Sequence, residues 1–147
     1  MERKIHQAFL SLAGIGFLPA GGTWASAVTA VGIYAANEMF ARGFYVFTLT
    51  VLCAFCLLSY FGRDAASDPS WVVLDEAAGV SIALLGVRRE WPWFVAAFVL
   101  FRFFDIVKPL GLRRLEKIAS PLAILWDDLG AGVYTWIILT AAAYFLP

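Results

Sequence analysis

The sequence is poor in the side chains that build the commonest catalytic and metal sites, because it has one histidine, His6, and two cysteines, Cys53 and Cys56. A single histidine excludes a catalytic mechanism that uses two histidines. No second cysteine pair is present to complete a zinc site. No arginine stands six residues after either cysteine, which excludes a Cys-x5-Arg phosphatase loop. Both cysteines lie in a charge-free apolar run, so we expect them to pack as small apolar side chains.

An excess of either charge is also missing, since 11 basic residues balance 11 acidic ones. A chain with no overall positive field is not expected to bind nucleic acid, and any electrostatic function must come from local placement. The N-terminus has no convincing small-residue cleavage site, so we expect no removable signal peptide and a chain that starts at Met1.

Apolar side chains dominate what is present: 62% of the 147 residues are hydrophobic, with 13 Phe and six Trp. This composition predicts one all-α integral membrane domain over residues 1–147, because a soluble core of this size cannot hide so much apolar surface. We expect a polytopic protein with about four to five transmembrane or re-entrant helices and one site at the cytoplasmic face. The expected segments are Thr23 to Ala41, Gly43 to Gly62, Trp71 to Val87, Trp93 to Ile106 and Leu129 to Pro147.

The turns between these segments are also predicted. A turn at Arg42-Gly43 would pair the first two segments as a helical hairpin. Charge and a proline at residues 88–92 would separate the third and fourth. The segment from Trp71 to Val87 is open to a second interpretation, as a re-entrant or interfacial helix.

The basic residues indicate the orientation. If all five segments cross, eight basic residues lie on one side and three on the other, and the positive-inside tendency makes the first side cytoplasmic. The eight are Arg3, Lys4, Arg63, Arg102, Lys108, Arg113, Arg114 and Lys117, and the three are Arg42, Arg88 and Arg89.

Five carboxylates interrupt otherwise apolar sequence, and this topology places all of them at helix ends on the cytoplasmic side. A charge at membrane depth is costly, so it usually marks a wet site, an ion or a partner. Oxygen ligands of this kind suit Mg²⁺, which often binds through a few carboxylates together with a substrate phosphate. The alternative is a set of structural salt bridges with neighbouring cations. The five are Asp75, Glu76, Asp105, Asp127 and Asp128.

Further polar groups accompany these acids. Arg102, Asp105 and Lys108 are spaced three apart, so they can share one helical face and offer an acid for metal and cations for phosphate oxygens. The glycine-rich stretch from Gly14 to Ser26 leads into the first segment. It includes the hydroxyls of Thr23 and Ser26, which suit either phosphate binding or an ordinary helix cap. Residues 110–121 favour a short amphipathic helix on anionic headgroups or a plain surface helix.

Four motifs in this order resemble the phosphatidylglycerophosphatase A family. They are a Pro-x-x-Gly-Thr-like segment (Pro19 to Ser26), Asp-Pro followed by Val-Val-x-Asp-Glu-x-x-Gly (Asp68 to Gly79), Phe-Arg-x-x-Asp-Ile-x-Lys-Pro (Phe101 to Pro109), and Asp-Asp-x-x-Ala-Gly (Asp127 to Gly132). The resemblance implies a multi-pass enzyme of the bacterial inner membrane that uses Mg²⁺ to hydrolyse phosphatidylglycerophosphate to phosphatidylglycerol and phosphate. The glycine-rich loop and the stretch before Asp127 depart from the family's usual residues, but every carboxylate is kept.

The combined hypothesis assigns the five carboxylates as both catalytic groups and Mg²⁺ ligands, one of them activating water. Arg102 and Lys108, with Thr23 and Ser26, would bind the substrate phosphate. A carboxylate nucleophile with a phosphoenzyme intermediate stays open as an alternative. Two other functions also stay open: a small membrane transporter with a polar pathway, and an inactive paralogue kept as an interaction partner. The expected partners are the phospholipid substrate and membrane lipids, and the sequence leaves the oligomeric state open.

Overall fold

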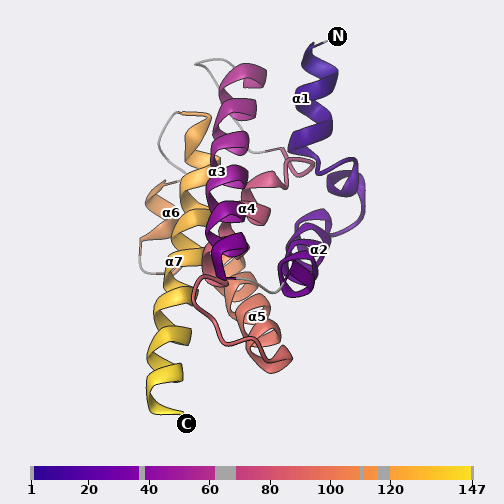
Figure 1. Cartoon of the computed structure of the whole chain (residues 1–147). Helices are drawn as coiled ribbons and strands as arrows, with labels where there is room; N and C mark the ends of the chain where they lie inside the picture. The colour runs from indigo at the N-terminus through magenta and orange to yellow at the C-terminus, as the bar shows by residue number, and fades with distance from the viewer. Residues whose placement is uncertain (1, 37–38, 62–68, 110, 116–119, 147) are drawn as a thin grey trace.

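The structure is a computed structural model that describes residues 2–36, 39–61, 69–109, 111–115 and 120–146. All the regular elements within these residues are helices, which confirms the all-α prediction, and Figure 1 shows the two termini at opposite ends of the bundle. The elements are α1 (Glu2–Leu10), η1 (Ile15–Phe17), α2 (Gly21–Ala36), α3 (Met39–Phe61), α4 (Leu74–Ala83), α5 (Trp91–Val107), α6 (Leu112–Leu115) and α7 (Leu122–Phe145).

Helix α4 lies at the centre of the bundle, where it contacts α7, α3, α2 and α5 (Figure 1). Eight of its ten residues are buried. Most of them are small, and this lets neighbouring helices approach closely. A Cβ on Gly79 would lie 2.6 Å from the carbonyl oxygen of Asp128, and a Cβ on Gly132 would collide with the carbonyl of Gly79. The closest approach of α4 and α7 therefore depends on these two glycines.

Two helices within the described residues are long and apolar enough to cross a membrane, over Ala41–Phe61 of α3 and Leu122–Phe145 of α7. Large apolar side chains such as Phe44, Phe47 and Phe55 stand exposed on α3, as expected for a surface that faces lipid. In the predicted segment over 71–87, only the ten residues of α4 are helical. They give about 15 Å of helix, whereas the hydrocarbon core of a membrane is about 30 Å thick. Ten helical residues are too few to cross on their own, but Arg88 donates to the carbonyls of Ala143 and Leu146, so the chain that begins α4 beside the start of α7 continues to the C-terminal end of α7.

The predicted turn at Arg42-Gly43 is wrong, because both residues lie inside α3. Arg42 is buried, and its guanidinium donates to the carbonyl oxygens of Leu84 (3.4 Å) and Val87 at the end of α4. The same group lies 5.1 Å from the ring centroid of Phe94. A cation paired in this way holds α3 against α4 instead of marking a chain reversal.

The ends of the chain also differ from expectation. Residues 2–10 form a helix, α1, that packs on α3, with the His6 ring 5.7 Å from that of Phe55. Helix α7 begins at Leu122 and not at 129, so the paired aspartates lie inside it. In the predicted segment over 110–121, α6 covers residues 112–115, whereas Leu110 and residues 116–119 lie outside the described residues, as do Arg63, Asp68 and Lys117.

The cysteine prediction is confirmed. Cys53 and Cys56 are buried free thiols in α3 and pack against Leu10 and Leu74 in an apolar cluster. They contribute to the contact between α3, α1 and α4, so the core of the bundle extends up to the first turn of α4.

Candidate active site

One cavity of about 890 Å³ brings together the predicted charged residues of three helix ends. Its walls come from the turn before α2, the start of α4, the end of α5 and the start of α7. These helix ends meet because α4 contacts all three of the other helices. The polar and charged side chains that line it include Thr23, Asp75, Glu76, Arg102, Asp105, Lys108, Asp127 and Asp128.

The first turn of α4 supplies Asp75 and Glu76, and Asp75 is buried. The chain entering this turn is fixed by the Val73 N–H, which donates to the carbonyl of Leu10 at 2.9 Å. The amide dipoles at a helix N-terminus favour negative charge in the first turn, which offsets part of the cost of burying these acids. Helix α4 thus presents two carboxylates to the cavity from its N-terminal end.

The last turns of α5 supply a cation and an acid one turn apart. Arg102 Nη1 lies 2.6 Å from Asp105 Oδ2 in the same helix and 3.7 Å from Glu76 Oε1 in α4. The predicted row of Arg102, Asp105 and Lys108 on one helical face is confirmed for the first two, which form an ion pair, but not for Lys108, which lies beyond the end of α5. Because Arg102 also approaches Glu76, it links α5 to α4 across the cavity.

Lys108 follows α5 directly and takes a left-handed backbone conformation, with a φ of 47°. Its N–H donates to the carbonyl of Phe104 at 2.8 Å, and Pro109 disfavours a helical conformation at the residue before it. Helix α5 therefore ends at Lys108. Its Nζ then reaches Asp127 Oδ2 on α7 at 2.5 Å. This ion pair joins the end of α5 to the start of α7.

Helix α7 supplies two adjacent aspartates, each about 5% exposed. The Asp128 N–H donates to Asp127 Oδ1 at 3.1 Å. Asp128 Oδ1 is buried and has no hydrogen-bond partner among the described residues. A buried polar atom without a partner is costly, so this oxygen is a direct candidate for an ion or substrate ligand.

The glycine-rich stretch forms one wall of the cavity, and residues 16–23 of it line the space. Thr23 is among them. Ser26 is not: it is fully buried, and its hydroxyl donates to the carbonyl of Gly22 at 2.8 Å. The structure thus brings every predicted site residue except Ser26 to this cavity.

Sequence reasoning missed two features of this wall. A Cβ on Gly22 would collide with Glu76 Oε1, so the absence of a side chain there makes room for the carboxylate. The glycine-rich composition was the available signal. Phe17 and Trp71 stack with ring centroids 5.9 Å apart and close the side of the cavity formed by the turn. No sequence pattern indicated that pair.

The family model for phosphatidylglycerophosphatase A matches residues 8–143. The chain belongs to the phosphatidylglycerophosphatase A family. A Haemophilus influenzae protein named phosphatidylglycerophosphatase A is 37% identical over 136 residues, which cover 87% of this chain and 82% of that protein. An Escherichia coli protein of the same name is 29% identical over 109 residues, 69% of this chain and 63% of that protein.

A third relative carries another name. A Bacteroides thetaiotaomicron protein named "Putative phosphatidylinositol-3-phosphatase" is 39% identical over 144 residues, covering 90% of each chain. No solved structure matches this chain. The names of these three relatives all refer to phospholipid phosphatases, and they differ in the headgroup that they specify.

The cavity of this phosphatidylglycerophosphatase A family member suits a divalent cation by its charge and its donor atoms. Five carboxylates and two cations line it, a formal excess of three negative charges when all are ionised. All the acidic donors are hard oxygens, the type that Mg²⁺ prefers. Within the described residues no three acid, histidine or cysteine side chains converge closely enough to hold a metal by themselves. A magnesium ion here would take one or two carboxylates and complete its shell with water and substrate phosphate.

Proposed function

We propose that this chain is a Mg²⁺-dependent phosphatase that removes the terminal phosphate of phosphatidylglycerophosphate at the cytoplasmic face of a bacterial inner membrane. The observation that carries the proposal is a single cavity in which five carboxylates meet Arg102 and Lys108. Membership of the phosphatidylglycerophosphatase A family, and two relatives that bear that name, support the substrate.

The two cations are placed to receive the phosphate. Arg102 is held by Asp105 and approaches Glu76, and Lys108 is held by Asp127, so both are fixed before the substrate arrives. Guanidinium and ammonium donors aimed at phosphate oxygens stabilise the charge that develops during phosphoryl transfer. The ordered cation and carboxylate pairs therefore supply preorganised electrostatics for phosphate.

The carboxylates supply metal ligands and a proton acceptor. Asp128, through its partnerless Oδ1, would hold Mg²⁺ together with at most one of the other four acids, Asp75, Glu76, Asp105 and Asp127. When bound, the ion would supply positive charge beside the phosphate oxygens. In the proposed reaction one carboxylate takes a proton from water, the water oxygen bonds to phosphorus, and the bond from phosphorus to the glycerol oxygen breaks. The leaving oxygen takes that proton back from the carboxylic acid, which restores the carboxylate, and the alcohol departs.

The membrane arrangement is proposed from the two long helices. The C-terminal end of α3 and the N-terminal end of α7 lie at the same end of the bundle (Figure 1), and Asp127 and Asp128 in the second turn of α7 line the cavity, so a crossing by both helices would place the site toward one membrane face. The excess of basic residues assigned to that side supports a cytoplasmic site. The shorter helices α2 and α5 would cross beside them, and α4 would enter from the same face.

The headgroup is the point on which the relatives differ, because the Bacteroides thetaiotaomicron protein is named for a phosphatidylinositol-3-phosphatase. Both substrates present a phosphate monoester on a lipid headgroup, and the same cations would receive either. A transporter is less well supported, because the five acids gather in one cavity. A pathway across the membrane would distribute them along its length.

The deciding experiment measures phosphate release by the purified protein in detergent, with Mg²⁺ or EDTA, from phosphatidylglycerophosphate and from phosphatidylinositol 3-phosphate. We expect Mg²⁺-dependent release from the first, loss of about 10²-fold or more in Asp105→Asn and Asp127→Asn, and no loss in Glu90→Gln. Glu90 is an exposed acid at the start of α5 and serves as the matched control. Faster release from the inositol lipid would reassign the headgroup, and folded protein inactive on both would refute the proposal.

A further inference from the structure

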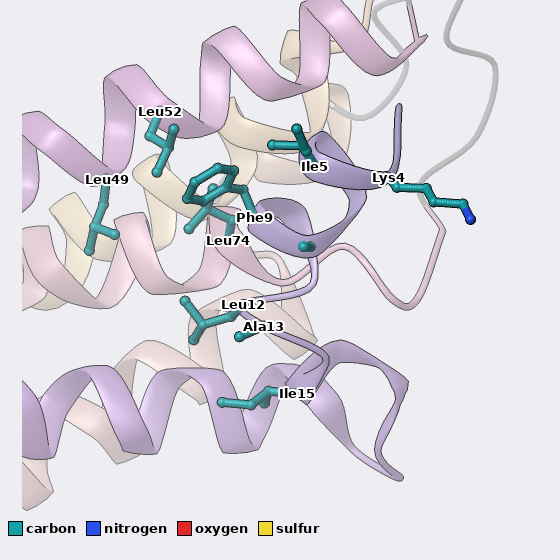
Figure 2. Close-up of a pocket in the computed structure, with 10 residues that line it drawn as sticks. Lys4, Ile5, Phe9, Leu12, Ala13, Ile15, Leu49, Leu52 and Leu74 are labelled. Carbon is teal, nitrogen blue, oxygen red and sulfur yellow. The ribbon is translucent and has the colours of Figure 1, made fainter. Parts of the chain in front are cut away.

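A second cavity, of about 790 Å³, lies between α1, the turn after it, α3 and the first residue of α4 (Figure 2). We call this cavity the apolar groove. Its lining is apolar except for Lys4, which lies at one edge with its ammonium directed away from the apolar side chains in Figure 2. Phe9, Leu52 and Leu74 lie close together in its interior. Such a lining has no polar group in its interior with which to bind a headgroup.

The apolar groove shares a wall with the cavity that the five carboxylates line, which we call the carboxylate cavity. Leu74 lines the groove, and the next residue, Asp75, lines the cavity. The same change occurs in the turn before α2, where Ile15 lines the groove and Gly16 the cavity. One layer of backbone therefore separates a space suited to hydrocarbon from a space suited to phosphate.

We propose that the apolar groove seats an acyl chain of the phospholipid whose terminal phosphate enters the carboxylate cavity, with Lys4 beside the lipid's anionic phosphodiester. This inference rests on the proposed function. A phospholipid phosphate monoester has hydrocarbon at one end and phosphate at the other, in the order in which the two spaces adjoin. Lys4 gives the edge of the groove the charge that an anionic lipid requires.

Seating one chain would bring the headgroup to the cavity in a restricted orientation. Binding energy from a part of the substrate that does not react can serve to position the part that does. The groove would therefore favour a lipid over its deacylated headgroup, and this preference is the property to measure.

The first test fills the groove. Ala8→Phe and Leu49→Trp each add bulk to its lining, and Val51→Phe adds comparable bulk to a half-exposed position of α3 outside the groove. The substrates are dipalmitoyl phosphatidylglycerophosphate in nanodiscs and its deacylated headgroup, glycerophosphoglycerophosphate. We expect kcat/KM for the lipid to fall about tenfold or more in the filled variants, with the headgroup compound unaffected. Val51→Phe should match wild type on both.

Equal losses on both substrates, or no loss on the lipid, would overturn the inference while leaving the phosphatase function in place. A second test does not depend on activity: phosphatidylglycerol with a diazirine in one acyl chain is irradiated with the protein in phosphatidylcholine nanodiscs. Labels at residues 5–15 and 49–52 that Leu49→Trp removes would support the groove. Labels elsewhere, or a dimer that protects these residues, would overturn it. Wild type that is inactive on both substrates but labelled in the groove would refute only the phosphatase.

Discussion

Gly22 offers a sharp test of the proposed site, because a side chain there would contact the Glu76 carboxylate and the Arg102 guanidinium. A Cβ on Gly22 would overlap Glu76 Oε1 and lie 3.3 Å from Arg102 Nη1. In Gly22→Ala the Glu76 carboxylate must move away. Since it is the far end of a flexible side chain, it can do so by rotation, and alanine is favoured over glycine in a helix by about 1 kcal/mol. We therefore expect little change in the melting temperature.

The expected loss of activity is much larger. Displacement of a positioned catalytic group by about 1 Å can cost on the order of 10²-fold in rate. The methyl group would also disturb the approach of Arg102 to Glu76, now 3.7 Å, while the 2.6 Å pair of Arg102 with Asp105 stays in place. We expect kcat/KM for phosphate release to fall about 100-fold in a protein that melts within a few degrees of wild type.

Gly16→Ala is the matched control for this prediction. A Cβ on Gly16 would collide with the backbone carbonyl of Trp71, which cannot rotate away. Relief requires a backbone shift, so we expect a loss of about 1–3 kcal/mol in the free energy of unfolding and a lower melting temperature. If Gly22→Ala kept full activity, or lost as much stability as Gly16→Ala, the assigned contact between Gly22 and Glu76 would be wrong.

Three further substitutions have outcomes that the structure fixes. Arg42→Met leaves the carbonyls at the end of α4 without their donor, so thermal unfolding should show a loss of about 1–3 kcal/mol. Lys108→Met removes the proposed phosphate donor and the partner of Asp127, and kinetics should show kcat/KM reduced by about 10²-fold, in part restored in Lys108→Arg. Asp128→Asn removes a buried acid, so it should melt no lower than wild type in EDTA, and it should lose the rise in melting temperature that we expect Mg²⁺ to give wild type. A Mg²⁺ response in Asp128→Asn equal to that of wild type would exclude Asp128 as a ligand.

The location of the site could be predicted from sequence because charge in an apolar chain is expensive. Asp75, Asp105 and Asp127 interrupt long apolar runs, and such interruptions usually lie at helix ends or in wet cavities. The structure confirms that these helix ends meet. The spacing of Arg102 and Asp105 also sufficed to predict their pairing, since helical geometry fixes which side chains share a face.

Hydropathy does not distinguish lipid from protein as the surroundings of a helix, and two of the errors follow from this. The run over 71–87 is apolar enough to face lipid, but its small residues fit it for burial among other helices as the short α4. The charge of Arg42 suggested a turn at the membrane surface. Its partners, the carbonyls of Leu84 and Val87, come from a segment more than 40 residues away, so the sequence near Arg42 does not reveal that the charge is buried inside a helix. The prediction that Ser26 binds substrate failed for another reason. Its hydroxyl donates to the carbonyl of Gly22 in the same helix, a bond that the sequence does not reveal.

The charge of the cavity and the packing of its walls oppose each other in a way that an ion would resolve. The five carboxylates repel one another, and two cations do not balance their charge. Separating α4 from α7 would relieve that repulsion. Gly79 and Gly132 instead permit these two helices to pack at their closest approach, which keeps Asp75 and Asp128 in the same cavity. The apolar core must therefore offset an electrostatic cost that a bound divalent cation would lower. Stability that increases with Mg²⁺ and depends on Asp128 is the expected signature of such a site.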